Sequence, residues 1–135
     1  MSLKITQAIC NQLVALAKQS SPIEAGGYLA AKEGMVVAVY ALTNVERSEE
    51  HFSFDPKEQF AALRESRAKG LELCAVFHSH PTSPARPSAE DIALAYDPNM
   101  LYVIVSLAEG REDIKAFRIK NQKVFPEPLE LVKDG

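Results

Sequence analysis

The sequence contains few of the residues that build cross-linked or cysteine-rich scaffolds. Its 135 residues include two cysteines, three histidines and no tryptophan. Two cysteines, Cys10 and Cys74, are too few for a disulfide framework or a cysteine-rich zinc site, and we expect both to be buried, reduced thiols. An excess of either charge is also lacking, because 15 Lys and Arg oppose 18 Asp and Glu. This balance excludes strong bulk attraction to nucleic acid or to an anionic membrane and favours protein partners.

Long hydrophobic runs are absent as well. No apolar run approaches the roughly 20 residues that span a bilayer, and residues 1–9 lack the regions of a signal peptide. We therefore expect a cytoplasmic protein. The composition, 47% hydrophobic and 24% charged, is that of an ordinary globular chain. The length and the absence of repeats predict one domain over residues 1–135.

Hydrophobic periodicity predicts alternating helices and strands, hence an α+β domain. Helices are expected over 5–19, from an N-cap at Asp55 to Gly70, and over 88–96. Strands are expected over 28–31 and 35–42 as a hairpin, then over 52–54, 71–77, 101–107 and 114–119. The charged loop 43–51, with His51, and the proline-containing tail after Phe125 are expected to be solvated surface.

Two of the three histidines lie in one tripeptide, His78-Ser79-His80, at the end of a predicted strand. Side chains two residues apart on a strand point to the same face, so both imidazoles can reach one ion. Asp91 follows in the first turn of the next helix and becomes a third ligand if the proline-rich loop 81–87 returns over the strand end. Two histidines, one carboxylate and an open position are typical of a catalytic zinc site.

Each of these features also has an explanation that involves no metal. A His-X-His at a strand end is compatible with a solvent-facing or hydrogen-bonded pair. Ser88 followed by Asp91 fits a helix capping box, and three prolines can simply stiffen a loop.

The order and spacing of these residues together resemble the motif of the JAMM (MPN+) metalloprotease family. His78-Ser79-His80, seven residues, Ser88, two residues and Asp91 match it without a gap, and Glu24 stands upstream where the family has a glutamate. The sequence is similar to the small prokaryotic branch of that family. The resemblance implies a single JAMM/MPN domain of the α+β class. Its mixed, mainly antiparallel sheet would be flanked by helices in a cytidine-deaminase-like arrangement.

The resemblance also implies roles for these residues. His78, His80 and Asp91 would bind one zinc ion per chain, Glu24 would act as general base and then acid, and Ser88 would donate to the oxyanion. The implied activity is a zinc-dependent peptidase or isopeptidase that cleaves after the C-terminal glycine of a ubiquitin-like or sulfur-carrier protein with a Gly-Gly tail. The oligomeric state stays open.

Three other functions are compatible with parts of this pattern. A binding or scaffold module would usually have lost a ligand or the glutamate, and none is missing here. A bacterial branch linked by name to DNA repair carries a similar pattern, but its Asn between the histidines is replaced by Ser79. A metal-dependent deaminase would require a Cys-X-X-Cys that the chain lacks.

Overall fold

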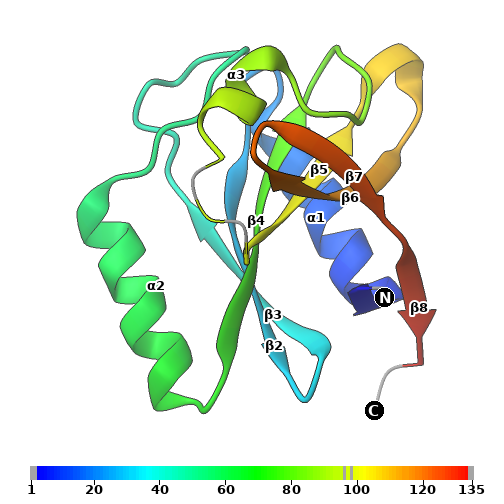
Figure 1. Ribbon diagram of the computed structural model, residues 1–135. Helices are drawn as coiled ribbons and strands as arrows, with labels where there is room; N and C mark the ends of the chain where they lie inside the picture. The colour runs from blue at the N-terminus through cyan, green and yellow to red at the C-terminus, as the bar shows by residue number, and fades with distance from the viewer. Residues whose placement is uncertain (1–2, 96, 98, 134–135) are drawn as a thin grey trace.

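The computed structural model describes residues 3–95, 97 and 99–133. The described residues form one sheet of eight strands together with three α-helices (Figure 1). The strands are β1 (Leu3–Thr6), β2 (Gly26–Lys32), β3 (Met35–Leu42), β4 (Glu72–His80), β5 (Leu101–Ser106), β6 (Asp113–Lys120), β7 (Lys123–Glu127) and β8 (Leu129–Val132). The helices are α1 (Gln7–Ser20), α2 (Pro56–Ala68) and α3 (Ala89–Ala93), and a short 3-10 turn covers Ala108–Gly110.

The sheet is mixed and curls so that its two edges approach each other. Its strand order is β7-β6-β5-β4-β2-β3-β1-β8. Strand β4 pairs antiparallel with β2 and parallel with β5, while β1 pairs parallel with both β3 and β8. The edge strands β7 and β8 are consecutive in the chain, joined only through Pro128, whose carbonyl accepts a hydrogen bond from Leu3 N–H at 2.8 Å.

Helix α1 packs into the concave side of this sheet and forms the main core. Thr6 caps the helix, its hydroxyl accepting from Ile9 N–H, and Ile9, Cys10, Leu13 and Ala17 are its buried face. These side chains join a cluster with residues from β1, β2, β4 and β5 that includes Leu29, Phe77 and Val103. Packing of this stripe, spaced at three and four residues, fixes the sheet that carries the histidines.

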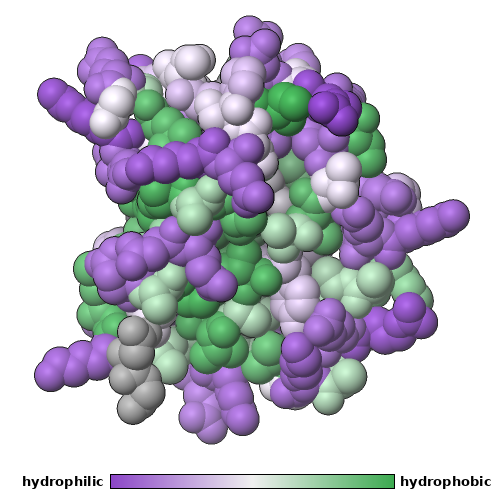
Figure 2. Space-filling model, turned by 180° about the vertical axis from the view of Figure 1, so that it is seen from behind, coloured by the Kyte–Doolittle hydropathy of each residue, from purple (hydrophilic) through white to green (hydrophobic). Residues whose placement is uncertain are grey.

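Helix α2 stands on the other side of β4, apart from α1 (Figure 1). Asp55 caps it and Pro56 occupies its first turn, as the sequence predicts. Seen from behind, hydrophobic residues gather in the middle of the surface and hydrophilic side chains surround them (Figure 2). None of the helices in the described part of the chain is long and apolar enough to cross a membrane.

The class is confirmed as α+β with a mixed sheet, but several predicted boundaries are wrong. Strand β1 was missed because Ile5 continues the helical spacing of α1. Residues 52–54 form no strand; instead, Phe54 packs against Phe52 and Tyr28, with ring centroids 4.8 and 5.2 Å apart. The strand expected over 71–77 continues through His80.

The remaining corrections concern the helix after the proline-rich loop and the C-terminal tail. The helix expected over 88–96 ends at Ala93, and Tyr96 lies outside the described residues. The tail beyond Phe125 lies at the surface, as expected, but it also completes β7 and forms β8, two strands that the sequence did not predict. Pro126 lies within β7, where a missing N–H is tolerated because β7 is an edge strand.

Candidate metal centre

Strand β4 carries the two histidines and turns them away from the α1 core. Alternation along the strand places Ala75, Phe77 and Ser79 on the buried core face. His78 and His80 therefore share the opposite face, and their ring centroids lie 4.9 Å apart. The sequence prediction that both imidazoles point to one place is confirmed by this separation.

The proline-rich loop that follows β4 is held by hydrogen bonds, and one of them orients the imidazole of His80. His80 Nδ1 lies 3.0 Å from the carbonyl oxygen of Pro84. The carbonyl can only accept, so Nδ1 carries the proton and Nε2 of neutral His80 keeps its lone pair. Ser106 Oγ holds the same loop by donating to Ser83 O at 2.6 Å, and Ala85 is buried beside Ile104.

Helix α3 brings the third ligand candidate over the histidines. Ser88 and Asp91 form the capping box, with Ser88 N–H donating to Asp91 Oδ2 at 2.8 Å and Asp91 N–H to Ser88 Oγ at 3.1 Å. Asp91 Oδ1 lies 3.2 Å from His78 Nε2, and Oδ2 lies 3.3 Å from His80 Nε2. The loop therefore returns over the strand end, as a third ligand at Asp91 requires, and the capping box expected from Ser88 and Asp91 is present as well.

The donor types fit a zinc ion. Imidazole nitrogens and a carboxylate oxygen are ligands that zinc takes, and each histidine Nε2 has one Asp91 oxygen beside it, Oδ1 for His78 and Oδ2 for His80. His80 Nε2 and an Asp91 oxygen both present lone pairs to each other, so a proton or a cation must lie between them. A second donor set, Glu24 with the same histidines, has its ligand atoms within 4.8 Å of one another.

Glu24 enters the site from the segment before β2. It is 5% exposed, and its Oε1 lies 3.4 Å from His78 Nδ1, a nitrogen that finds no hydrogen bond among the described residues. Ser79 Oγ accepts from Ala25 N–H at 2.8 Å and so fixes the backbone next to Glu24. The glycines that follow allow close approach, since a Cβ on Gly27 would lie 1.9 Å from Tyr40 O.

The two carboxylates determine the protonation of the site. Burial alone lowers the pKa of His78, but the contacts and charges of Asp91 and Glu24 outweigh it and raise the pKa to about 9. For Asp91, burial raises the pKa, yet His78, His80 and the Ser88 N–H hold it well below its usual range. The metal-free site therefore holds a cationic imidazole between two carboxylates, a place where a metal cation can replace the proton.

A cavity of 450 Å³ opens over these residues. Glu24, His78 and Asp91 lie in its lining, and Phe52, Phe54, Leu94 and Tyr102 form apolar walls. A neighbouring cavity of 580 Å³ runs between α2 and β4, and both are lined by Tyr28, Gln59 and Met100. The two cavities are therefore neighbours, and the one over the candidate ligands has largely apolar walls.

The chain is similar to known proteins along most of its length. Residues 6–120 match a family described as prokaryotic homologs of the JAB domain. The chain belongs to this JAB (JAMM/MPN) family. It is 33% identical over 134 residues to the CysO-cysteine peptidase of Mycobacterium tuberculosis, covering 97% of this chain and 92% of that one. It is also 38% identical over 73 residues to the desampylase of Pyrococcus furiosus, covering 54% of this chain and 52% of that one.

Solved structures agree with the JAB assignment. The solution structure of DSY2949 from Desulfitobacterium hafniense superposes with a TM-score of 0.88 at 40% identity, covering 97% of this chain and 93% of that chain. AF2198, a JAB1/MPN domain protein from Archaeoglobus fulgidus, has the same fold with a TM-score of 0.66 at 20% identity, covering 96% and 98%. The resemblance inferred from the sequence and the fold it implies are therefore confirmed.

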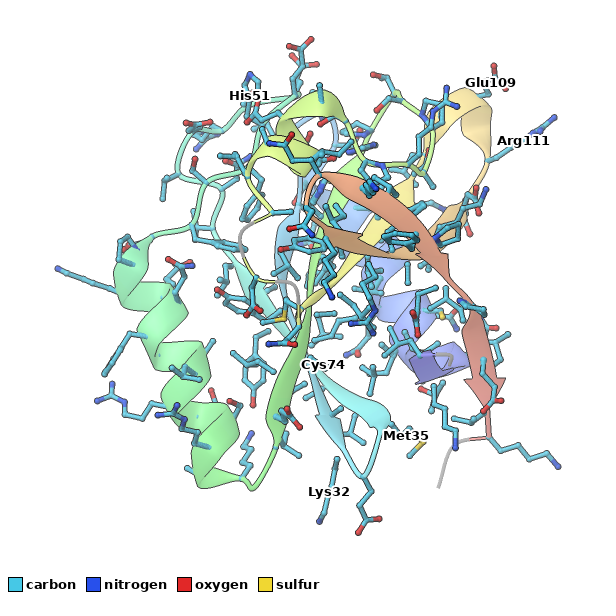
Figure 3. All side chains as sticks on the ribbon, viewed as in Figure 1. Lys32, Met35, His51, Cys74, Glu109 and Arg111 are labelled. Carbon is cyan, nitrogen blue, oxygen red and sulfur yellow. The ribbon has the colours of Figure 1, made fainter. Side chains whose placement is uncertain are left out.

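The structure brings together all five residues singled out by the sequence, namely Glu24, His78, His80, Ser88 and Asp91. It adds two that sequence reasoning missed. His51 (labelled in Figure 3), expected to be solvated, is exposed but pairs with Glu90, Nδ1 to Oε2 at 2.5 Å, and both residues line the cavity. Asn44, in the same loop as His51, is buried and donates to the His51 carbonyl. Neither position has a sequence signal that separates it from ordinary loop residues.

Proposed function

We propose that this protein is a zinc-dependent peptidase or isopeptidase that cleaves after the C-terminal glycine of a small ubiquitin-like or sulfur-carrier protein. The observation that carries the proposal is the Asp91 carboxylate between the Nε2 atoms of His78 and His80, with Glu24 on the far side of His78. Two neutral imidazoles, a carboxylate and a separate buried acid are the parts of a hydrolytic metal centre.

Zinc is assigned to His78 Nε2, His80 Nε2 and one Asp91 oxygen. The Asp91 distances of 3.2 and 3.3 Å favour this set over the one with Glu24, whose carboxylate faces His78 through Nδ1 instead. Zinc bound there would supply Lewis acidity, which makes water available as a nucleophile near neutral pH. The Pro84 carbonyl and the Ser88 N–H act as outer partners that hold His80 and Asp91 in place.

Glu24 is then free to move protons. Its carboxylate is buried at the base of the cavity, where it would accept a proton from the attacking water and return it to the leaving amine. Ser88 uses its oxygen lone pair to cap α3 and keeps its hydroxyl hydrogen for another acceptor. That hydrogen is assigned to the carbonyl oxygen of the scissile bond as negative charge develops on it.

The substrate class rests on the relatives and on the shape of the site. Two of the relatives are named CysO-cysteine peptidase and desampylase. The cavity over the candidate ligands has apolar walls that include Phe52 and Phe54. A tail ending in glycines suits this cavity because it has no side chains that would collide with the walls. The partner is thus proposed to be a carrier protein with a Gly-Gly tail.

The direct test is cleavage of defined conjugates by the zinc-loaded protein. A set of small ubiquitin-like proteins would carry cysteine or a lysine peptide on the C-terminal glycine, and mass spectrometry would detect the released carrier. We expect cleavage directly after the glycine, its loss with a chelator, and its return when zinc is restored. Matched conjugates with the last two glycines replaced by alanine should react far more slowly.

Two outcomes would contradict the proposal. Cleavage that is unaffected by chelation would exclude a metal-dependent reaction. Zinc binding with no cleavage of any glycine-ended conjugate would favour the binding or scaffold module weighed from the sequence.

A further inference from the structure

Asn44 lies just beyond β3, far from the metal ligands in sequence, yet it is one of the few buried polar residues of the chain. It is 7% exposed. Its side-chain amide Nδ2 faces three carbonyl oxygens, those of Glu24 at 3.2 Å, Ser48 at 3.3 Å and His51 at 2.8 Å. Its Oδ1 accepts from Glu46 N–H at 3.2 Å and Ser53 N–H at 3.4 Å. One amide therefore binds four backbone groups within residues 43–55, here called the β3–α2 loop, and joins them to the carbonyl of Glu24.

The backbone of Glu24 is held by this loop on both sides. Its N–H donates to Ser48 O at 2.9 Å, and its carbonyl accepts from Asn44 Nδ2. Strand β2 begins only at Gly26, so these contacts, together with the Ala25 N–H bond to Ser79 Oγ, fix the Glu24 peptide groups. The Glu24 carboxylate sits 3.4 Å from His78, so a shift of its backbone changes that distance directly.

The same loop forms one wall of the cavity above the site. Glu50, His51, Phe52 and Phe54 all line that cavity. The backbone carbonyl of His51 is bound by Asn44, and its side chain pairs with Glu90, the neighbour of Asp91 on α3. The β3–α2 loop thus connects the segment of Glu24 with the helix of Asp91, and Asn44 lies at its centre.

We propose that Asn44 is a positioning residue: it sets the location of the Glu24 carboxylate and couples it to the β3–α2 loop that lines the substrate cavity. This inference rests on the proposed function for Glu24 but concerns a residue outside the metal centre. A hydrogen-bonded asparagine with two donors and one acceptor is suited to the task, because it can hold several backbone groups of an irregular loop at once.

Asn44→Asp tests the donor half of this amide. The carboxylate has the same shape and still accepts from Glu46 and Ser53 N–H, but it cannot donate to Glu24, Ser48 or His51. Asn44→Ala removes both halves. Thr6→Ala is the matched control, since Thr6 is equally buried and caps α1 on the other side of the sheet. All three are expected to lower stability.

We expect kcat per zinc-loaded protein to fall by about a hundredfold in both Asn44 variants, KM to rise because the same loop lines the cavity, and zinc affinity to change little. The Thr6→Ala control should keep its kcat. In a double-mutant cycle with Glu24→Gln, the Asn44 substitutions should cause no further loss of kcat, because their effect on kcat passes through Glu24. Wild-type kcat in both Asn44 variants, or fully additive losses in the cycle, would overturn the inference.

A readout that does not require turnover separates this inference from the proposed function. Amide hydrogen exchange should accelerate at Glu24 in Asn44→Asp, while amides of α1 keep their protection. Equal protection of Glu24 in variant and wild type would contradict the coupling even if the protein cleaved conjugates. Failure of wild-type protein to cleave any conjugate would instead concern the proposed function alone.

Discussion

Ser79 and Ala25 exchange two hydrogen bonds. The Ser79 N–H donates to the Ala25 carbonyl at 2.8 Å, and Ser79 Oγ accepts from the Ala25 N–H, also at 2.8 Å. Ser79 lies between the two histidines and Ala25 follows Glu24, so one contact joins both parts of the centre although they are 54 residues apart in sequence. Its position on the core face of β4 makes Ser79 a structural link rather than a ligand.

Replacing Ser79 by alanine should therefore be costly. The buried Ala25 N–H would lose its acceptor, which is expected to lower the free energy of unfolding by about 1–3 kcal/mol. Urea unfolding of the metal-free protein measures this. Ser66→Ala is the comparison, because Ser66 is equally buried but donates within α2 to Leu63 O. Ser79→Ala should also weaken zinc binding, whereas an unchanged zinc affinity would show that the link does not position the histidines.

Ser88 combines helix capping with the proposed donation to the oxyanion, and substitutions can separate the two roles. Glycine is a serviceable N-cap, so Ser88→Gly should cost only a few tenths of a kcal/mol in stability. Because it removes the hydroxyl donor, it should lower kcat by about 10²–10³-fold. Ser88→Thr retains both functions and serves as the control in steady-state kinetics. Turnover by Ser88→Gly at the wild-type rate would remove Ser88 from the reaction.

Zinc binding should release protons over a defined pH range. The pKa of His78 is raised to about 9 in the metal-free protein, so at pH 7.5 its imidazole carries a proton that zinc must displace. We expect about one proton per zinc at that pH and none well above pH 9. Calorimetric titrations in two buffers with different ionisation enthalpies measure the number. Absence of proton release at pH 7.5 would contradict the assigned pairing of His78 with its carboxylates.

The raised pKa of His78 also makes the stability of the folded protein depend on pH. A histidine whose pKa rises on folding stabilises the folded state fully below its ordinary pKa of 6.5 and loses that contribution as the pH rises through about 9. The free energy of unfolding of the metal-free wild type is thus expected to fall as the pH rises from 6.5 to about 9. His78→Gln should flatten this part of the profile.

The sequence predicted most of the candidate site because its parts lie close together in the chain. His78, His80, Ser88 and Asp91 fall within one strand, loop and helix, so they meet once the proline-rich loop returns over the strand end. Glu24 could be placed only through the family resemblance, because its approach depends on pairing between β2 and β4. Asn44 could not be found, since a loop asparagine carries no mark of the five backbone groups it binds.

The fold was predicted where periodicity is strong and missed where pairing determines the structure. The stripe on α1 and the apolar run that becomes most of β4 are visible in the sequence. Strands β1 and β8 are four residues each and exist because they pair with each other in parallel across the ends of the chain. No local pattern indicates such a long-range pair. Phe52 and Phe54 alternate like a strand but are held by aromatic contacts in a loop.

Cys74 gives a further test that is independent of the metal. Burial raises the pKa of its thiol to about 11, and its Sγ lies 3.5 Å from Leu29 O. Cys74 should therefore react slowly with a thiol reagent at pH 8 in the folded protein and quickly after unfolding in urea. A Cys10→Ser variant isolates the Cys74 signal. Rapid labelling of the folded variant would show that the sheet around Cys74 opens more readily than its packing indicates.

The roles of Asp91 and Glu24 are distinguished by measuring zinc content and turnover in the same two variants. Asp91→Asn and Glu24→Gln each keep the shape of the side chain and remove its charge. We predict that Glu24→Gln retains one zinc per chain with turnover reduced by about 10²–10⁴-fold, and that Asp91→Asn loses both zinc and turnover. Loss of zinc from Glu24→Gln with retention by Asp91→Asn, or undiminished cleavage by Glu24→Gln, would contradict a zinc peptidase in which Asp91 is the ligand and Glu24 the base.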